Sequence, residues 1–317
     1  MYKPRGCITG RDDPQGRPLA ECLLLDTNYK NRVVSISAGE RARQLEWLQQ
    51  RLGQSFIVEN RPGAAANVAT EMVARSPADG YTLLMATSTT LGISPALYKS
   101  SPIDPVRDFA PVSQVGSVNF FLIANPAFPA KTVGEAIEAI RGNPGKFNYA
   151  SVGSGSPHHL FMEALKAELG LSIQHVPYKG TQAAIPDLLT GGVQMMFADA
   201  TVAVPNIQAG KVTPLGTSSA KPTTLVPGVP PIAATVKGFD WEAWQGIVAP
   251  AATPPAIVAK LAAELQRIQS TPEFREQLRK FGMESAPPHT PAEFAAIVAA
   301  EQPRWQKAVK DSGAKVD

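Results

Sequence analysis

The residues best suited to chemistry form a Gly/Ser-rich segment, residues 151–156, between a predicted strand and a predicted helix. A turn of this kind leaves main-chain N–H groups unpaired at the positive end of a helix, and its small side chains let an anion approach them. The segment lacks the Gly-Lys-Ser/Thr ending of a P-loop and the third glycine of a dinucleotide-binding fingerprint. It therefore predicts anion binding without a nucleotide cofactor, although a plain tight turn would have the same composition.

Polar residues also follow two other predicted strands. Four hydroxyl side chains, Thr87 to Thr90, come directly after the strand at 82–86, which is where open α/β sheets bind their ligands. One of these hydroxyls is expected to cap a helix, and the others to face a cleft. Asp199 ends another strand, where its carboxylate would accept a hydrogen bond from a ligand hydroxyl, an ammonium group or a water, or else cap the following helix.

A serine hydrolase is the alternative chemistry. Ser156 is followed by proline and lacks the G-x-S-x-G elbow. His158 and His159 are adjacent, so on a helix they would point about 100° apart and could not both face one serine. We expect His159 to orient the Gly/Ser segment instead, and His175 to end a strand. A cytoplasmic enzyme that acts on a small carboxylic acid through Ser156 and His159 remains the competing hypothesis.

Composition narrows the classes of partner. The chain has 317 residues, enough for about two domains, and its 30 basic and 27 acidic residues are scattered along it. No Lys/Arg stripe with interleaved aromatics supports a nucleic-acid partner. Cys7 and Cys22 form no metal-ligand spacing, and no His/Asp cluster suggests a metal, so we expect no cofactor. No apolar run approaches the roughly 18 residues of a membrane span.

Short β-type runs alternate with helical patterns from residue 32 onward, which implies parallel sheets covered by helices on both faces. The runs are rich in Val, Ile, Phe and Tyr and are bounded by Gly, Pro, Asn or Asp. The predicted strands are residues 33–36, 56–59, 82–86, 120–124, 147–150, 173–176, 194–197, 213–216 and 246–249.

Helix starts are marked by threonines. The capping-box pattern Thr-x-x-Glu begins at Thr132 and at Thr290, and Thr-Pro pairs begin at Thr253 and Thr271. A threonine hydroxyl at such a position accepts from free N–H groups, and a proline at the first helical position has no N–H to leave unpaired. These signals predict helices after each of the four threonines.

The last third of the chain is predicted to be almost entirely helical, so it must pack on a sheet built elsewhere. We therefore expect a discontinuous first lobe from residues 32–122 and 222–317, with residues 123–221 inserted as a second lobe. Residues 1–31 form a divergent N-terminal segment, and the Pro-rich stretch at 222–231 is typical of an extended connector.

A series of motifs resembles one known family. They include Glu59-Asn60-Arg61-Pro62-Gly63-Ala64, Pro77-Ala78-Asp79-Gly80-Tyr81, Gly153-Ser154-Gly155-Ser156-Pro157-His158-His159-Leu160 and His175-Val176-Pro177-Tyr178-Lys179-Gly180. In this order and at this spacing they resemble the Bug-type receptors, the extracytoplasmic solute-binding proteins of tripartite tricarboxylate transporters (the TctC family). The likeness extends over residues 32–317.

The resemblance implies a type II periplasmic-binding fold, with two α/β lobes joined by crossing strands and a ligand cleft between them. It implies a monomeric, periplasmic receptor without catalysis, which binds a small carboxylate (a di- or tricarboxylate, an acidic amino acid or an aromatic acid) and works with membrane transporter subunits. A non-transporting carboxylate sensor would look the same. Carried over by position, the ligand-binding residues are Ser37, Ala38, Gly39, Thr87, Ser88, Thr89, Ser151, Gly153, Ser154, Gly155, Ser156, His159, Lys179, Gly180, Thr181 and Asp199.

The chain departs from the family pattern at its first predicted ligand loop. The family has Gly-Gly-x-x-Asp and a full-length helix there, whereas this chain has Ser37-Ala38-Gly39-Glu40-Arg41 and a shorter helix. Glu40 would bring a second negative charge near the carboxylate, at a cost of roughly several kcal/mol in a cleft of low dielectric constant. The first 31 residues match nothing in the family and show no export signal, so the expected location is cytoplasmic if this start is genuine and periplasmic by the resemblance. Two hypotheses follow. The chain is either a damaged or mis-started copy of a family member, or a paralogue whose ligand entrance is redesigned.

Overall fold

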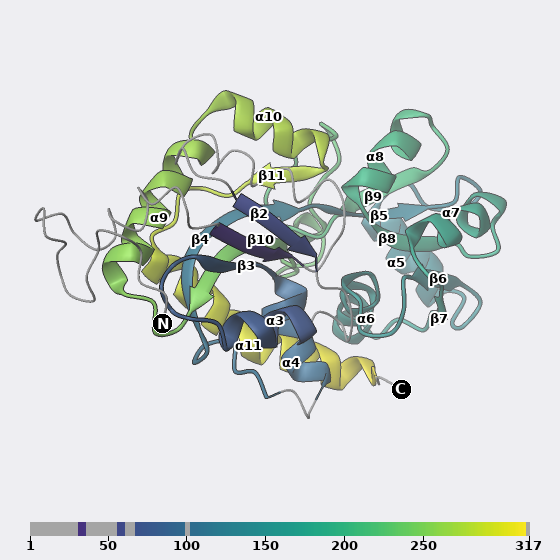
Figure 1. The fold of residues 1–317 in the computed structure, drawn as a ribbon. Coiled ribbons are helices and arrows are strands. Elements are labelled where there is room, and N and C mark those ends of the chain that lie inside the picture. Colours follow the sequence, from purple (N-terminus) through teal and green to yellow (C-terminus); the bar gives the residue numbers. More distant parts are fainter. Residues whose placement is uncertain (1–30, 36–55, 61–66, 99–101, 315–317) are drawn as a thin grey trace, which may run out of the picture.

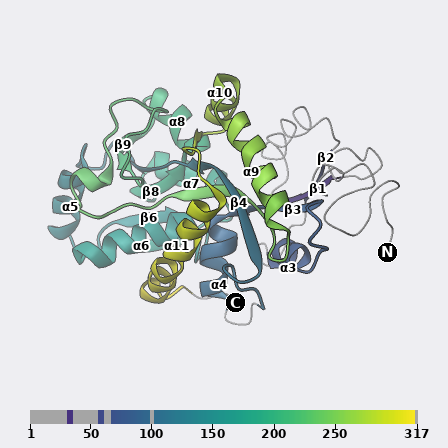
Figure 2. The ribbon, with the colours of Figure 1, turned by 90° about the vertical axis from the view of Figure 1, so that its left-hand side faces the viewer.

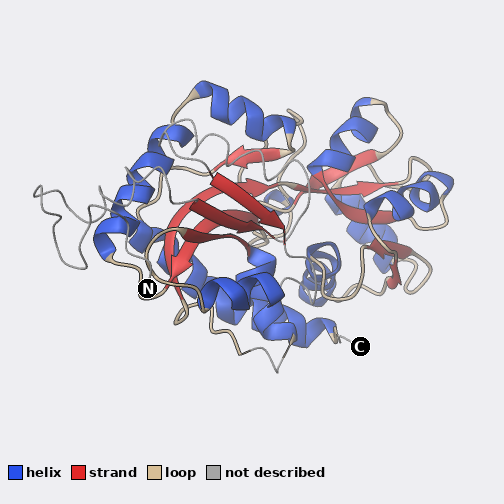
Figure 3. Ribbon diagram, viewed as in Figure 1, coloured by secondary structure: helices blue, strands red, loops and turns tan. Residues whose placement is uncertain are grey.

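The computed structural model describes residues 31–35, 56–60, 67–98 and 102–314. They form two α/β lobes, each built on its own sheet, with the strands of the second lobe drawn in teal and blue-green on the right of Figure 1. Helices lie against the faces of both sheets (Figure 3). The predicted loop residues Ser37, Ala38 and Gly39 lie outside the described residues.

The first sheet has the strand order β11-β4-β10-β3-β1-β2. Strands β1, β2 and β3 are parallel, whereas β10 is antiparallel to both β3 and β4, and β11 is antiparallel to β4. The sheet is thus mixed, and the expectation of purely parallel sheets was wrong. Its strands are β1 (Asn31–Ser35), β2 (Phe56–Asn60), β3 (Thr82–Thr87), β4 (Phe109–Val118), β10 (Ala243–Pro250) and β11 (Met283–Ser285).

The second sheet has the strand order β7-β6-β8-β5-β9. Strand β6 is parallel to both β7 and β8, and β5 is antiparallel to β8 and β9. Every residue of β5 is buried. The strands are β5 (Phe120–Ala124), β6 (Asn148–Ser151), β7 (Gln174–Pro177), β8 (Met195–Asp199) and β9 (Thr213–Thr217).

The nine predicted strands are all present, with ends shifted by a few residues, but β4 and β11 were missed. Strand β4 contains Pro111 and Gly116, which resemble strand breakers. Pro111 is tolerated because the pairing with β10 shifts register beside it, between Ile247 and Val248. Gly116 lets β11 approach, since a Cβ there would lie 2.5 Å from the carbonyl oxygen of Glu284.

Three of the four predicted threonine caps are confirmed. The side chains of Thr132, Thr271 and Thr290 accept the expected helical N–H, and Thr290 forms a complete capping box with Glu293. Thr253 does not cap. Its helix begins later, at Pro255, and within the described residues the buried Thr253 hydroxyl has no hydrogen-bond partner.

The helices of the first lobe are α3 (Asn67–Ala74), the π-helical turn η3 (Thr89–Ile93), α4 (Ser94–Leu97), α9 (Pro255–Gln269), α10 (Pro272–Lys280) and α11 (Pro291–Ser312). Those of the second lobe are α5 (Val133–Arg141), α6 (Pro157–Leu169), α7 (Thr181–Thr190) and α8 (Ala200–Gln208), and the short 3₁₀ helix η4 (Ile232–Ala234) lies in the connector before β10.

The two lobes are joined by crossing segments and by packed aromatic rings. Asn119, between β4 and β5, donates to Glu284 Oε2 at 2.7 Å and to Thr223 Oγ1 at 3.0 Å, which fixes the crossing point. Helix α11 lies beside α6 of the second lobe (Figure 2), where the Trp305 ring stacks 6.2 Å from Phe161. The division into lobes at residues 122 and 222 stays a prediction, and the first sheet ends at Val118 on one side of the crossing while the second begins at Phe120.

Candidate functional site

The predicted residues of the second lobe lie along one edge of its sheet. Strand β6 lies between the parallel strands β7 and β8, with Ser151 opposite Pro177 and Ala150 opposite Met196. The carboxyl ends of parallel strands meet at the same sheet edge, which is where ligands bind in folds of this type. The loop at 152–156, the turn before α7 and the residue Asp199 therefore lie side by side.

The Gly/Ser loop at residues 151–156 is held by hydrogen bonds within itself and from α6. Ser156 caps α6 by accepting from the His159 N–H at 3.3 Å, and its hydroxyl donates to the Gly153 carbonyl at 2.7 Å. Gly153 and Gly155 have φ angles of +119° and +77°, which favour glycine. The Gly155 N–H donates to Nδ1 of His159 at 3.2 Å. The prediction that His159 orients this loop is confirmed.

Two amides of the loop have no partner among the described residues. The N–H groups of Gly153, Gly155 and Ser156 all donate within the loop and α6, whereas those of Val152 and Ser154 make no hydrogen bond in the described part of the chain. They stand just before a helix of 13 residues, whose N-terminal end favours a negative charge. This arrangement can hold an anion by main-chain donors alone.

Asp199 is the polar residue at the end of β8. It occupies the N-cap position of α8 without a side-chain capping bond, and its carboxylate instead accepts from the hydroxyls of Thr181, at 3.4 Å, and Thr201. His158 Nε2 lies 3.7 Å from Asp199 Oδ2. The carboxylate therefore links α6, α7 and β8 at the sheet edge. The expected N-cap position of Asp199 is confirmed, but its side chain makes no capping bond.

The turn before α7 brings the remaining second-lobe residues to the same edge. Gly180, with a φ angle of +112°, is the N-cap of α7, and Thr181 begins the helix. Lys179 is exposed. The Tyr178 N–H donates to the Ser151 carbonyl at 2.9 Å, which ties this turn to the Gly/Ser loop.

The first lobe contributes the turn after β3. The Thr87 N–H donates to Thr90 Oγ1 at 2.8 Å, and the Thr90 N–H donates to Thr87 Oγ1 at 3.1 Å. The Thr87 hydroxyl thus accepts a helical N–H, as was expected of one hydroxyl, and Thr90 Oγ1 accepts in return from the Thr87 N–H. Ser88 is only 1% exposed and makes no side-chain capping bond in the described structure, and Thr89 is half-buried.

The two edges approach one another at a glycine. A Cβ on Gly155 would lie 2.6 Å from Leu97 Cδ2, so α4 of the first lobe packs directly against the Gly/Ser loop of the second. The structure therefore brings the β3 turn and the β6–β8 loops into one region. Strand β1, which precedes the predicted loop at residues 37–39, lies next to β3 and parallel to it.

The geometry gives no Ser156–His159 dyad in the described structure. The Ser156 hydroxyl contacts the Gly153 carbonyl and the His159 main chain, and the His159 ring contacts Gly155 instead. Burial first, and then the neighbouring His175, lower the pKa of His159 to about 4, which makes it a poor general base.

One contact at the site could not be predicted from the sequence pattern. His175 lies within β7, not at its end, and its Nε2 is 2.5 Å from Ser151 Oγ. In the register of these strands His175 lies opposite Tyr149 and Ser151 lies opposite Pro177, so the contact is diagonal and depends on the pairing of β6 with β7.

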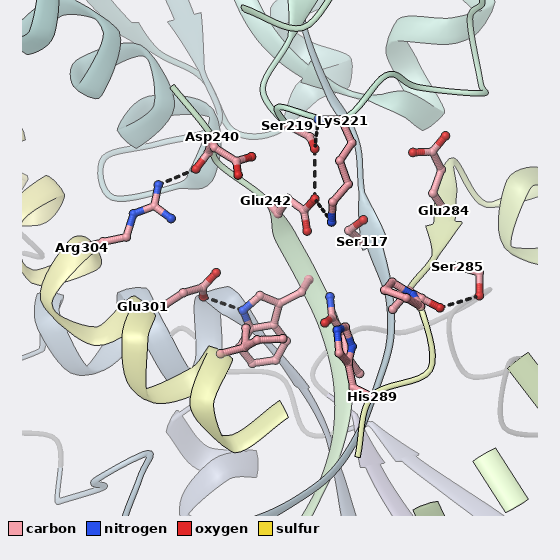
Figure 4. Close-up of a pocket in the computed structure, with 15 residues that line it drawn as sticks. Ser117, Ser219, Lys221, Asp240, Glu242, Glu284, Ser285, His289, Glu301 and Arg304 are labelled. Carbon is pink, nitrogen blue, oxygen red and sulfur yellow. Dashed lines mark hydrogen bonds and ion pairs between the residues drawn. The ribbon is translucent and has the colours of Figure 1, made fainter. Parts of the chain in front are cut away.

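A separate polar cavity of about 260 Å³ lies at the hinge, and none of the predicted site residues that the structure describes lines it. Figure 4 shows that its side chains hold the connecting segments together: Glu242 accepts from Ser219 at 3.0 Å and from Lys221 at 3.4 Å, and Arg304 reaches the Asp240 carbonyl. We interpret this cavity as part of the hinge.

The described part of the chain shows neither a membrane-spanning helix nor a metal-binding cluster. None of its helices combines the length and apolar character that crossing a bilayer requires. Its His, Cys, Asp and Glu side chains form no group of three or more that could hold a metal ion.

Two α/β lobes with crossing strands, and with loops suited to an anion at the strand ends, define a type II periplasmic-binding fold. The family model described as "Tripartite tricarboxylate transporter family receptor" (TctC) matches residues 41–314. The chain is 32% identical over 273 residues to protein BugT of Bordetella pertussis, covering 85% of this chain and 83% of BugT. The protein therefore belongs to the tripartite tricarboxylate transporter receptor family, and the resemblance to Bug-type receptors is confirmed.

Solved structures of similar proteins contain dicarboxylates. The structure described as R. palustris Rpa4515 with adipate is 29% identical, with a TM-score of 0.77, over 90% of this chain and 99% of that one. MatC (Rpa3494) from Rhodopseudomonas palustris with bound malate is 29% identical, with a TM-score of 0.71, over 88% and 99%. Members of the family are solute-binding receptors, and these two bind small carboxylates.

Proposed function

We propose that this protein is a receptor that captures a small dicarboxylate between its lobes and releases it unchanged. The observation that supports this most directly is the pair of unpaired amides, Val152 and Ser154, at the start of α6. Main-chain donors at a helix N-terminus bind a carboxylate without needing an arginine. The adipate and malate bound by similar proteins favour a dicarboxylate over the other acids that the family resemblance allows.

The proposed contacts come from both lobes and meet at the sheet edges described above. The Gly/Ser loop and the turn at Gly180 offer amides and hydroxyls, and Asp199 offers an acceptor for a ligand hydroxyl or an ordered water. The turn after β3 closes the site from the first lobe. The complete proposed set is Ser37, Ala38, Gly39, Thr87, Ser88, Thr89, Ser151, Gly153, Ser154, Gly155, Ser156, His159, Lys179, Gly180, Thr181 and Asp199.

Thermal unfolding in the presence of a panel of mono-, di- and tricarboxylates, acidic amino acids and aromatic acids tests the proposal. A ligand present at about 100 times its dissociation constant stabilises the folded state by about 2.7 kcal/mol. We expect a dicarboxylate to give the largest shift. A protein that responds to none of these acids, at concentrations up to tens of millimolar, would contradict the proposed function.

Recovery of the acid separates a receptor from an enzyme. After prolonged incubation with excess protein, the bound dicarboxylate should be recovered chemically unchanged, as measured by mass spectrometry. Conversion that disappears in Ser156→Ala would instead establish the competing enzyme.

We also propose that the receptor acts in the periplasm and delivers its ligand to the membrane subunits of a tripartite tricarboxylate transporter. Membership of the family supports this role. Deleting the gene should abolish uptake of the acid identified above, and osmotic-shock fractionation should recover the native protein from the periplasm. Uptake that survives the deletion would favour a sensor that does not transport.

The first predicted ligand loop calls for its own test, because the family match begins at residue 41, beyond Ser37-Ala38-Gly39. We propose that Glu40 weakens carboxylate binding there. Replacing residues 1–51 with the corresponding segment of BugT should then raise the affinity for the acid, measured by calorimetry. Unchanged affinity would favour the hypothesis of a paralogue with a redesigned ligand entrance over that of a damaged copy.

A further inference from the structure

Behind the Gly/Ser loop, histidine rings from two elements are in contact with each other and with the loop. His175 Nε2, from β7, is 2.5 Å from Ser151 Oγ, and Ser151 Oγ in turn accepts the Gly153 N–H at 3.1 Å. The His175 ring lies 4.2 Å, centroid to centroid, from the ring of His159 on α6. His159 accepts the Gly155 N–H. Each of these two loop glycines is therefore held, directly or through one hydroxyl, by a histidine.

The histidines are supported from the interior of the second lobe by a carboxylate. Glu163 accepts from the Tyr149 hydroxyl and from Lys166 Nζ, the latter at 2.6 Å, and it lies 3.9 Å from His159 Nε2. The Tyr149 ring stacks on His175 with 5.0 Å between centroids. Among the described residues, Glu163 and Lys166 act electrostatically on both histidines, and Tyr149 bonds to Glu163.

The hydrogen bonds determine which form of His159 is compatible with the loop. Because its Nδ1 accepts from the Gly155 N–H, the ring is uncharged and its proton is on Nε2, facing Glu163. A second proton on Nδ1 would oppose two donors across 3.2 Å, so Gly155 would have to move. A charge on His175 as well would place two cations with ring centroids 4.2 Å apart.

The surroundings keep both rings uncharged at neutral pH. Burial is the largest cause of the lowered pKa of His159, about 4, and of the lowered pKa of His175. Lys166 lowers both pKa values further, and Glu163 partly opposes the shift. The His159 side chain is only 4% exposed, so water cannot replace the lost contact.

We infer that His175 and His159 are positioning residues of the ligand loop, and that only their uncharged pair holds the Val152 and Ser154 amides ready for a carboxylate. The inference rests on the proposed function for its ligand. It adds a regulatory property to that site: acidification releases the bound acid by moving the loop, in addition to any protonation of the acid itself. Neither histidine needs to touch the ligand for this effect.

Replacing each histidine by a residue with a side-chain amide tests the inference, because the amide can form one of the histidine's hydrogen bonds but cannot titrate. His175→Gln places the new side-chain amide near the position of Nε2, and His159→Asn places the new side-chain carbonyl near that of Nδ1. With adipate and malate as calorimetric probes at pH 7.5, we expect His175→Ala to lose at least about tenfold in affinity, corresponding to about 1.4 kcal/mol. His175→Gln should stay within about threefold of the wild type.

The pH dependence distinguishes positioning from a simple structural role. Between pH 7.5 and 4 the wild type should lose affinity more steeply than His175→Gln or His159→Asn. The titration of the probe is common to all three proteins and cancels in the comparison. His289→Asn, at the distant hinge cavity, should follow the wild type. Equal pH profiles in all variants, or tighter binding by the wild type in acid, would overturn the inference.

A readout without ligand keeps this test independent of the proposed function. With ¹⁵N-glycine labelling, the Gly155 amide resonance of the ligand-free wild type should shift as the pH falls toward 4, and in His159→Asn it should stay constant. If that resonance does not move in the wild type, the inference is wrong even where binding occurs. If it moves as expected but neither probe binds at pH 7.5, the failure belongs to the proposed ligand class.

Discussion

The two sheet edges that would face a ligand differ in how their loops are held in place. In the second lobe, three parallel strands end at one edge, histidines hold the Gly/Ser loop there, and two main-chain amides of that loop have no partner in the described structure. In the first lobe, the turn after β3 closes on itself, because Thr87 and Thr90 satisfy each other. The edge of the second lobe is thus held by histidines from other positions, whereas that of the first lobe is held by its own threonines.

This difference indicates that the two lobes contribute differently to ligand binding. A loop supported by its neighbours can leave amides unpaired, since the energetic cost is offset by side-chain bonds elsewhere in the loop. In the turn after β3, Thr87 and Thr90 are engaged with each other, which leaves Ser88 and Thr89 to contact a ligand. We therefore expect the second lobe to supply most of the affinity for a carboxylate, while the first lobe closes over it through contacts such as that of Leu97 with Gly155.

The largest expected effect concerns the histidine support of the second lobe. The pKa of His159 is lowered from 6.5 to about 4 in the folded state, so the unfolded chain takes up the proton first as the pH falls. Stability is therefore complete above about pH 6.5 and declines toward pH 4, by at most about 3 kcal/mol from this group. His159→Asn should remove that part of the decline in urea unfolding series measured at several pH values.

His289→Asn is the control for this measurement, because His289 lies at the hinge cavity away from the loop. Its stability should follow the wild-type pH dependence. A His159→Asn protein that loses stability as steeply as the wild type between pH 6.5 and 4 would show that the second-lobe edge does not depend on the uncharged ring.

A smaller effect is expected from the glycine that shapes the free amides. Gly153→Ala introduces a side chain at a φ angle of +119°, where nothing lies within 4 Å of the new Cβ, so backbone strain is the only cost. We expect the loop to rotate and the affinity for a dicarboxylate to fall at least about tenfold, or about 1.4 kcal/mol. Isothermal calorimetry on the acid selected by the panel measures this loss.

Gly238→Ala is a matched control for Gly153→Ala. Gly238 has a φ angle of +87° and equally open space around its Cβ, but it lies in the connector before β10. The two variants should lose similar stability, and Gly238→Ala should keep its affinity. Equal affinities for the two variants would remove the Gly/Ser loop from the proposed site.

The sequence predicted the parts of this architecture that follow from local chemistry. Strands such as β5 and β8 were recognisable because apolar runs end at Asn, Asp or Gly, and the Thr290 capping box is a short-range pattern. Strand β4 was missed because Pro111 and Gly116 are strand breakers in isolation. Their tolerance depends on a register shift in β10 and on the close approach of β11, which are tertiary facts.

In the candidate site, too, the contacts that depend on tertiary structure could not be predicted from the sequence. The Gly/Ser loop and the role of His159 could be predicted, since helix i and i+3 neighbours are close in the sequence. The contact between Ser151 and His175 could not, because it joins residues 24 positions apart through the pairing of β6 with β7. The opposite error was made at Thr253. The local sequence predicted a cap there, but the helix begins at Pro255 and the Thr253 side chain does not cap it.

The smallest expected effect tests the self-satisfied turn of the first lobe. Thr90→Val keeps the side-chain volume but removes the hydroxyl that accepts from the Thr87 N–H and donates to the Thr87 carbonyl. Because Thr90 is only 2% exposed, the lost bonds are not replaced by water, and the free energy of unfolding should fall by about 1–2 kcal/mol. Affinity for the dicarboxylate should change less than about twofold, since the second lobe supplies the free donors. Urea unfolding and calorimetry on the same sample measure both quantities, and a tenfold loss of affinity without a loss of stability would reverse the assignment of the two edges.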